Sequence, residues 1–348
     1  MEIDFLLIGQ GLAGSALGYR LKKAGFKIKL LDQPDLNQST KIAAGLYNPV
    51  TGRKMVKTWN ADQLFPEIEP FYQELEQVTK KSFLRPINIY RPFLSIEEQN
   101  EWMGNSADPG FSKYIQKIYQ ESQSEFLKDP YGGVLLKNSG WLDSKAFMEG
   151  MSEYFGEDLI LDYLQEDQLQ FQEGFWNYGD LKARSVIYCN GVAANQSKFF
   201  GFLPFAPVKG EILEVKQDFC PDYIVNRGVF RVHLGDGIHR VGSTYTWHDL
   251  DQGPTERAKN ELTERLAGLV QLPVEEYVSH KTGIRPATKD RKPFLGKHPD
   301  LQSVYIFNGF GAKGVSLIPF YSQVMVNHLT RSTPIPSEVA ITRYFNYI

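Results

Sequence analysis

The spacing of apolar residues predicts alternating strands and helices near the amino terminus. Residues 4–8 form a continuous apolar run, which predicts a buried strand. An alanine-rich helical pattern follows and stops at Gly25, and residues 26–31 then alternate into a second strand that ends in Asp32. This strand–helix–strand order predicts an α/β domain with a parallel sheet.

The middle of the chain mixes the two spacings. Helices are expected over residues 64–78, 96–102, 112–126 and 144–155. Strands are expected over residues 83–93, 132–136, 159–163 and 181–191, with a hairpin made by 168–171 and 174–178. The strand at 181–191 ends on glycine, which lets the chain pass close beneath a bound dinucleotide.

From Pro207 onward the pattern changes to strands joined by turns, which predicts a separate antiparallel sheet on the substrate side. Its strands are expected over residues 208–215, 228–234 and 239–247, with a turn at Asp236–Gly237 and a helix over 255–270. The last third is then expected to return to the nucleotide-binding domain, with a strand over residues 303–307 that is followed by a helix.

Three glycines at the end of the first strand have the spacing of a dinucleotide cradle. Gly9 lets the chain turn, Gly11 admits a pyrophosphate close to the backbone, and Gly14 allows the helix to pack on the strand. Asp32 lies 18 residues after Gly14, near the offset at which an acid meets a ribose hydroxyl. The acid favours FAD or NAD over NADP, and the alternative is an ordinary turn without ligand.

A second glycine-rich turn, over residues 308–317, also opens a helix. The first turn already serves phosphate, so this helix start suits another anion, the N1 and O2 side of a reduced flavin. Between the two turns, residues 39–49 are rich in small side chains and predict a short helix or turn against something flat or anionic. A small helix packed on the sheet explains that composition equally well.

Composition adds limits to this picture. Hydrophobic content of 42%, a mean hydropathy of -0.34 and a net charge of -3 describe a globular chain without a general attraction for nucleic acid or anionic membrane. We expect a cytoplasmic protein without a signal peptide or membrane span. The basic residues Arg53, Lys54 and Lys57 fit a solvated loop or a nucleic-acid contact. No metal site is assigned, and neither cysteine, Cys189 or Cys220, is expected to be reactive.

Taken together, the motifs resemble the FAD-dependent oxidases of the D-amino-acid oxidase and glycine oxidase superfamily, in family order and over nearly the whole chain. Within it, the segments 44–49 and 283–296 are most similar to the oxidase domain of the bifunctional enzyme that modifies the tRNA wobble uridine. The matching motifs are Gly9-x-Gly11-x-x-Gly14 with Asp32, Ala43–Gly45, Gly140–Leu142, Gly191, Pro207–Gly210, Asp236–Gly237 with Val241–Thr244, Gly283–Pro286 with Asp290, Pro293 and Gly296, and Gly309–Val315.

The resemblance implies a Rossmann-type FAD-binding domain (residues 1–75, 132–203 and 280–348) and an antiparallel-sheet substrate domain (76–131 and 204–279). The expected fold class is α/β for the Rossmann-type domain, and the two domains together form a D-amino-acid oxidase-like, α+β architecture. It implies noncovalent FAD, with cofactor contacts from Gly9, Gly11, Leu12, Ala13, Gly14, Asp32, Gln33, Ser39, Thr40, Ala43, Ala44, Gly45, Leu46, Asn190, Gly191, Gly283, Gly309, Gly311, Ala312, Lys313, Gly314 and Val315.

The same resemblance implies that the flavin accepts a hydride from the α-carbon of an amino acid or N-substituted glycine, and that the imine hydrolyses. Arg285 would bind the substrate carboxylate, and Lys313 would lie on the N1 and O2 side of the flavin. Tyr47, Tyr245 and Trp247 are candidates for the pocket wall. The electron acceptor, oxygen or another, and the oligomeric state stay open, as does tRNA as a partner.

Two other functions fit parts of the sequence. A dehydrogenase that uses NAD explains the motif from Gly9 to Asp32, but not the later glycine-ended strand and the second glycine-rich turn. A non-catalytic or regulatory protein that binds FAD or another nucleotide on the same fold explains all of the glycine motifs. Reduction of a bound flavin by an amine would distinguish the oxidase from the dehydrogenase and from the non-catalytic protein.

Overall fold

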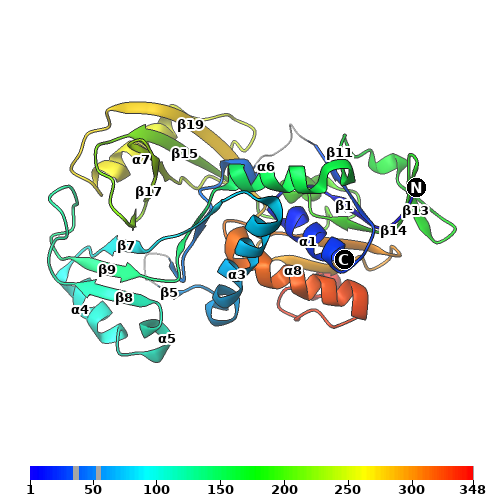
Figure 1. The fold of residues 1–348 in the computed structure, drawn as a ribbon, viewed down its shortest axis with the longest axis horizontal. Helices are drawn as coiled ribbons and strands as arrows, with labels where there is room; N and C mark the ends of the chain where they lie inside the picture. Colours follow the sequence, from blue (N-terminus) through cyan, green and yellow to red (C-terminus); the bar gives the residue numbers. More distant parts are fainter. Residues whose placement is uncertain (34–38, 52–55, 348) are drawn as a thin grey trace.

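A computed structural model describes residues 1–33, 39–51 and 56–347 of the chain. Figure 1 shows two neighbouring lobes, each built around an eight-stranded sheet. The first lobe holds both ends of the chain, and the second is formed mainly by the middle of the sequence. No helix in the described ranges is both long and apolar enough to cross a membrane.

The sheet of the first lobe has a parallel core, as the strand–helix–strand pattern predicts. Its parallel strands, in spatial order, are β11 (Leu159–Leu161), β2 (Ile28–Asp32), β1 (Glu2–Ile8), β14 (Leu181–Tyr188) and β21 (Val304–Asn308). Antiparallel strands complete it: β12 (Gln170–Gln172) and β13 (Phe175–Tyr178) beside β14, and β20 (Phe294–Lys297) beside β21. The Rossmann-type prediction is therefore confirmed.

Four helices cover this sheet and its edge: α1 (Leu12–Lys23), α3 (Ala61–Thr79), α6 (Ser144–Phe155) and α8 (Gly314–Arg331). Helix α8 packs against both α1 and α3, as Figure 1 shows. The Tyr72 hydroxyl of α3 donates to the carbonyl of Val315 at 3.1 Å, so α3 is tied to the first turn of α8. Helix α3 runs through Pro66 and Pro70 because its apolar face is buried along most of its length.

Short elements connect the lobes. They are α2 (Ser39–Ile42), β3 (Leu46–Tyr47), β4 (Val50–Thr51), β5 (Val56–Lys57), β6 (Leu84–Pro86) and β10 (Gly140–Leu142). Strand β10 pairs with β3 and β6 in a small sheet of its own. At the carboxyl end, a 3-10 helix, η4 (Ile341–Tyr347), packs against β20, and Arg343 there forms an ion pair with Asp290 at 2.9 Å.

The second lobe contains a mostly antiparallel sheet, as the turn-rich pattern predicts. Its spatial order is β19 (Glu276–Arg285), β15 (Val208–Lys216), β18 (Ile238–Gly242), β17 (Phe230–Gly235), β16 (Ile224–Asn226), β7 (Ile89–Pro92), β9 (Gly133–Leu136) and β8 (Ile115–Tyr119). Helices α4 (Ile96–Asn105), α5 (Pro109–Ser112) and α7 (Glu256–Ala267) accompany it. Asp236 and Gly237 have φ of 52° and 70°, which confirms the hairpin turn between β17 and β18.

One predicted element is wrong. Residues 112–126 are expected to be helical, but β8 occupies Ile115–Tyr119 and pairs with β9. The register of this pair shifts between Ile115 and Lys117, so the strand contains an irregularity like a β-bulge. An inserted residue breaks the alternation of a strand and leaves apolar residues three apart, which resembles the spacing of a helix.

The domain boundaries stay a prediction, although the second sheet extends past two of them. Strand β9 and the end of β19, residues 280–285, belong to this sheet, whereas the prediction places both segments in the FAD-binding domain. The chain therefore returns to the first lobe only after Arg285. The substrate-side sheet thus presents its last strand directly beside the first lobe.

Candidate active site

The glycines after β1 make the close contacts that their spacing predicts. Gly9 has a φ of 99°, and a Cβ atom there would lie 2.7 Å from the Cα atom of Asn190 at the end of β14. A Cβ atom on Gly14 would lie 1.8 Å from the carbonyl oxygen of Gly9. Strand and helix therefore meet without any space for side chains, and at the start of α1 the amide of Ala13 has no hydrogen-bond partner in the described chain and is left open to an anion.

Two side chains surround this cradle. Asp32, at the end of β2, accepts a hydrogen bond from the backbone amide of Gln10 at 2.9 Å. Burial raises the pKa of Asp32, and the amide hydrogen bonds and Lys41 partly offset the shift. Thr40 Oγ1 accepts from the amide of Leu12 at 3.2 Å. The structure thus brings the predicted acid and Thr40 to the first turn of α1, and Gln33 follows Asp32 directly.

The small-residue segment after α2 contacts both lobes, since the carbonyl of Ala43 accepts from Ser144 at the start of α6 and from Arg240 of β18. Gly45 has a φ of 71°, and a Cβ atom on it would lie 2.0 Å from the carbonyl oxygen of Leu142. A Cβ atom on Gly283 would lie 3.5 Å from Ser39 and from Ile42, so α2 packs on β19. The predicted residues Ser39, Thr40, Ala43, Ala44, Gly45 and Leu46 therefore lie in one continuous stretch between the cradle and Gly283.

The end of β14 is joined to the second glycine-rich turn. Asn308 Nδ2 donates to the carbonyl of Gly191 at 2.9 Å, and its Oδ1 accepts from the amide of Gly309 at 2.7 Å. Oδ1 of Asn190 is buried and has no hydrogen-bond partner within the described part of the chain. A buried oxygen without a donor is costly, and a bound group that donates to it removes the cost. Asn308 was not predicted, although its position before the glycine turn was a usable signal.

The second turn opens α8 beside the start of α1. Gly309 and Gly311 have φ of 78° and 54°, and a Cβ atom on Gly314 would lie 3.2 Å from Leu12. Lys313 is the N-cap residue of α8, ahead of Val315, and follows Ala312. Burial lowers the pKa of Lys313, and the nearby charge of Arg291 adds to the effect. In the described chain, the Lys313 ammonium has neither a hydrogen-bond partner nor an ion pair.

Arg285 ends β19 at the boundary between the lobes. Its Nη2 donates to Ser243 Oγ at 2.7 Å and its Nη1 to the carbonyl of Thr244 at 3.4 Å. The guanidinium carbon lies 4.5 Å from the ring centroid of Tyr245. A Cβ atom on Gly210 would lie 2.1 Å from Nη2, so a larger residue at position 210 would displace the guanidinium from this position.

The positive charge of Arg285 is not balanced by a nearby negative charge. Among the described residues, no carboxylate lies within ion-pair distance of its guanidinium. Burial lowers the pKa of Arg285, yet an arginine keeps its proton at neutral pH. A half-buried cation that is oriented by neutral oxygens and lacks an acidic partner is suited to bind an anionic group. The amide of Gly311 donates to the carbonyl of Pro286 at 3.1 Å, which places the second glycine turn beside Arg285.

The three predicted wall residues do not all meet here. Tyr245 and Trp247 follow β18 and are exposed, with exposed fractions of 55% and 61%. Tyr47 is in the core with 1% exposed, and its hydroxyl donates to Glu69 at 3.3 Å. Tyr245 contacts the guanidinium, whereas Tyr47 lines a different cavity.

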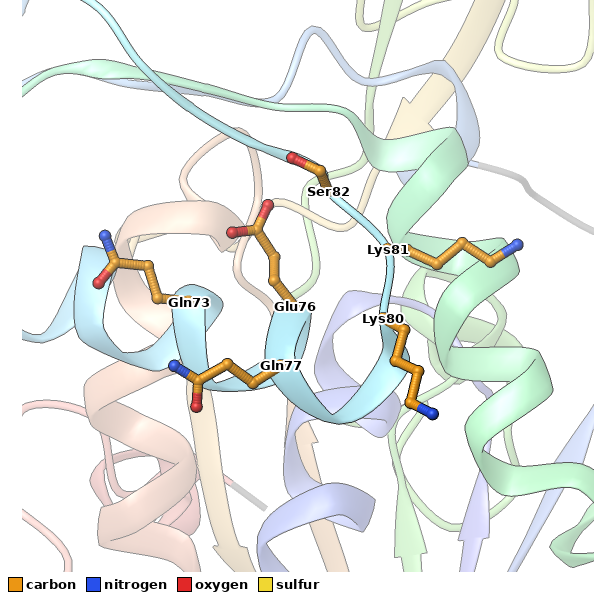
Figure 2. A pocket seen from close by; sticks show the side chains of 6 residues that line it. All are labelled: Gln73, Glu76, Gln77, Lys80, Lys81 and Ser82. Carbon is orange, nitrogen blue, oxygen red and sulfur yellow. The ribbon is translucent and has the colours of Figure 1, made fainter.

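Two cavities lie elsewhere. Figure 2 shows the first, of about 430 Å³, at the carboxyl end of α3 among the polar side chains Gln73, Glu76, Gln77, Lys80, Lys81 and Ser82. The second, of about 370 Å³, is lined by Tyr47, Asp62, Phe65, Pro66, Glu69, Pro70, Lys113, Tyr114 and Asn138. Neither is lined by Arg285 or by the glycine cradle, so neither belongs to the candidate site.

An ion network holds the small-residue segment to the second sheet. Glu214 accepts from Arg240 at 2.9 Å, from Ser279 at 2.7 Å and from Lys281 at 3.2 Å. Arg240 Nη1 in turn donates to the carbonyl of Ala43 at 3.4 Å. Burial acts to raise the pKa of Glu214, but these hydrogen bonds and positive charges outweigh it and hold the pKa at about 2.

Glu214→Gln is expected to destabilise the protein by about 2 kcal/mol at pH 7, a value reduced from the full shift because solvent screens the pair. The depressed pKa means that the stabilisation is complete above about pH 4.5 and is lost as the pH falls toward 2. Thermal unfolding at pH 7 and pH 3.5 measures this difference. Glu264→Gln, on the exposed side of α7, is the control. A Tm difference of equal size at both pH values would contradict the assignment.

Comparisons with known proteins agree with this geometry. The model of the family described as DAO, FAD dependent oxidoreductase, matches residues 4–327. Glycine oxidase from Pseudomonas aeruginosa is 28% identical over 96% of this chain and 97% of its own length. The crystal structure of glycine oxidase from Geobacillus kaustophilus has a TM-score of 0.81 at 19% identity, covering 98% of this chain and 99% of that one. The resemblance found in the sequence motifs is therefore confirmed.

A second relative is larger. The tRNA 5-methylaminomethyl-2-thiouridine biosynthesis bifunctional protein MnmC from Leptospira interrogans serogroup Icterohaemorrhagiae serovar copenhageni is 23% identical over 98% of this chain. The match covers 59% of that relative, so the present chain spans little more than half of the bifunctional protein.

Proposed function

We propose that this chain, which belongs to the FAD dependent oxidoreductase family, oxidises the C–N bond of an amino acid or an N-substituted glycine. FAD is its cofactor, and a NAD-dependent dehydrogenase is no longer an alternative. The observation that carries the proposal is the half-buried Arg285, which is oriented by Ser243 and Thr244 and has no acidic partner within the described chain. The name of the glycine oxidase relative points to the same substrate class.

The residues present fit FAD. The glycine contacts that exclude Cβ atoms leave backbone amides at the start of α1 for the pyrophosphate, and Asp32 suits a ribose hydroxyl. We propose that the unpartnered Oδ1 of Asn190 and the start of α8 with Lys313 face the remainder of the cofactor. A helix start and an ammonium both favour negative charge, so they suit the N1 and O2 side of the flavin.

The chemistry that bound FAD would supply is acceptance of a hydride from the carbon next to the amine nitrogen, and the resulting imine would be hydrolysed by water. The chain's own residues bind and orient the substrate. Arg285 pairs with the carboxylate through two parallel N–H donors, which fixes the orientation of the substrate and therefore the direction of its Cα–H bond. Ser243 and Thr244 hold the guanidinium from one side, and the ring of Tyr245 covers its face. No side-chain base is needed when the amine binds in its neutral form.

Anaerobic mixing with single candidate substrates tests the proposal. Purified protein is expected to lose its visible flavin absorbance with at least one of glycine, sarcosine, proline or a D-amino acid. Full absorbance with the whole panel would instead favour the non-catalytic alternative. Reoxidation by air, compared with reoxidation by a quinone, would then identify the class of electron acceptor.

Ser243→Ala is expected to raise KM for the carboxylate substrate by about tenfold. A hydrogen bond to a charged group contributes about 1.5–3 kcal/mol, and the remaining contact with Thr244 places the effect at the lower end. Because Ser243 acts through Arg285, flavin content is expected to stay unchanged. Steady-state kinetics with Ser243→Thr, which restores the hydroxyl, checks this: rescue of KM is expected, and equal loss in both variants would contradict the positioning role.

A larger substrate is a second candidate. Tyr245 contacts Arg285, Trp247 lies two residues further along the chain, and both are exposed. Flat aromatic surfaces of this kind stack on nucleobases. The bifunctional relative is named for tRNA modification. Two of the predicted basic residues, Arg53 and Lys54, lie outside the described ranges. Flavin reduction by a carboxymethylaminomethyl-uridine nucleoside that is faster than with glycine, and slowed by Trp247→Ala, would favour this candidate.

A further inference from the structure

A thiol and two imidazoles meet in the second lobe, away from the candidate active site. His233 of β17 and His239 of β18 are directly opposite each other, with ring centroids 5.0 Å apart. Cys220 lies in the connection between β15 and β16, and its Sγ is 3.9 Å from His239 Nε2. One ligand atom from each of the three residues lies within 4.8 Å of the other two.

The position of this cluster separates it from Arg285. Strand β15 pairs with Arg285 at Val208 and with His239 at Val215. Seven residues of an extended strand span roughly 23 Å. The cluster therefore has no direct part in binding the substrate carboxylate, and a variant in it can be judged apart from the oxidation.

The distances suit a tetrahedral ion. A zinc ion with bonds of about 2.3 Å to sulfur and about 2.0–2.1 Å to nitrogen and oxygen holds its ligand atoms roughly 3.3–3.6 Å apart. His239 Nε2 lies 3.9 Å from Cys220 Sγ and 3.1 Å from the carbonyl oxygen of Gln217. Because the three side-chain ligand atoms lie within 4.8 Å of one another, each pair has to approach by at most about 1.5 Å to reach tetrahedral spacing around one ion.

One nitrogen of the cluster, His233 Nε2, is buried and has no hydrogen-bond partner in the described chain. Buried ring nitrogens are normally paired, so an unpaired one at a site with a nearby thiol points to a ligand that the protein atoms alone do not supply. Imidazole nitrogen together with thiolate sulfur is the donor set that zinc prefers.

The nearest buried cation is Arg231, which is 1% exposed. Its Nε donates to Gln217 Oε1 at 3.0 Å and its Nη2 to the carbonyl of Phe219 at 2.6 Å. It repels a metal ion, but its charge also interacts favourably with a thiolate at Cys220. The thiolate is the form that binds metals, and it offsets part of the combined positive charge.

We propose that Cys220, His233 and His239 bind one Zn²⁺ ion, with the carbonyl oxygen of Gln217 as the fourth ligand. A site closed by four protein ligands is structural rather than catalytic. The ion would link the connection of residues 217–223 to the β17–β18 hairpin. No disulfide makes this link, because Cys189 and Cys220 are both free thiols. The sequence alone did not predict this site, because the three ligands converge only when the strands pair.

Metal titration of the holoenzyme tests the site. After chelator treatment, the protein is titrated with Zn²⁺ against a chromophoric chelator and, separately, with Co²⁺. One ion per chain is expected, and bound Co²⁺ is expected to show a thiolate-to-metal charge-transfer band. Cys220→Ser and His233→Asn are each expected to weaken Zn²⁺ binding by more than about 100-fold, because loss of an outer-shell partner alone costs about 10- to 100-fold.

His248→Asn, an exposed histidine outside the cluster, is the matched control and is expected to bind like the wild type. Flavin content and the Tm in metal-free buffer show that each variant is folded. Zn²⁺ is expected to raise the Tm of the wild type and of His248→Asn, but not that of Cys220→Ser. Absence of the charge-transfer band, or unchanged Zn²⁺ affinity in folded Cys220→Ser, would overturn the proposal.

Discussion

Arg285→Ala is expected to lower kcat/KM for carboxylate-bearing amines by roughly 30- to 4000-fold while FAD stays bound. Removing one partner of a buried, hydrogen-bonded charge pair costs about 2–5 kcal/mol, and each 1.4 kcal/mol is tenfold. The substrate carboxylate would then enter a site where Ser243 and Thr244 offer it no positive charge. Anaerobic flavin reduction at several substrate concentrations separates the loss of binding from the loss of rate.

Two further variants sharpen this result. Arg285→Lys keeps a positive charge but loses the planar fork, so we expect only partial recovery. Arg257→Ala, an exposed arginine on α7, is the matched control and is expected to behave like the wild type. Wild-type reduction rates in Arg285→Ala would show that the carboxylate is bound elsewhere and would remove the main support for the proposed function.

The parts of the fold that were predicted correctly depend on neighbours close in the chain. Gly9, Gly14 and Asp32 belong to one strand–helix–strand unit, so their spacing alone carries the geometry of the cradle. Helix α6 follows the same rule, because Asp143 caps its first turn by accepting from the amides of Lys145 and Ala146.

The parts that the sequence could not predict depend on register between distant strands. Arg285 was expected to bind a carboxylate, but its contacts with Ser243, Thr244 and Gly210 arise only when β19 pairs with β15 and the chain beyond β18 folds over both. Tyr47 illustrates the opposite problem. An aromatic residue beside a glycine motif suits a pocket wall as well as a core, and only packing distinguishes the two.

Gly14→Ala is expected to remove FAD binding and to destabilise the protein by more than about 3 kcal/mol, since overpacking costs about 1–3 kcal/mol even where a site can adjust. The added Cβ atom would lie 1.8 Å from the carbonyl oxygen of Gly9, whereas ordinary contact begins at 3.4 Å. Helix α1 would have to move away from β1 by about 1.6 Å, and that displaces the amides expected to bind pyrophosphate. Flavin content per chain and the Tm measure the two effects.

The control for this variant is Gly104→Ala in helix α4, where an added Cβ atom meets nothing within 4 Å and φ is not in the left-handed region. Alanine stabilises a helix relative to glycine, so this variant is expected to keep its flavin and to melt at or slightly above the wild-type temperature. If Gly14→Ala retained FAD like Gly104→Ala, the cofactor phosphates could not depend on the close approach of α1 to β1. A loss of FAD in Gly14→Ala alone would place them at that turn, independently of any assay for oxidation.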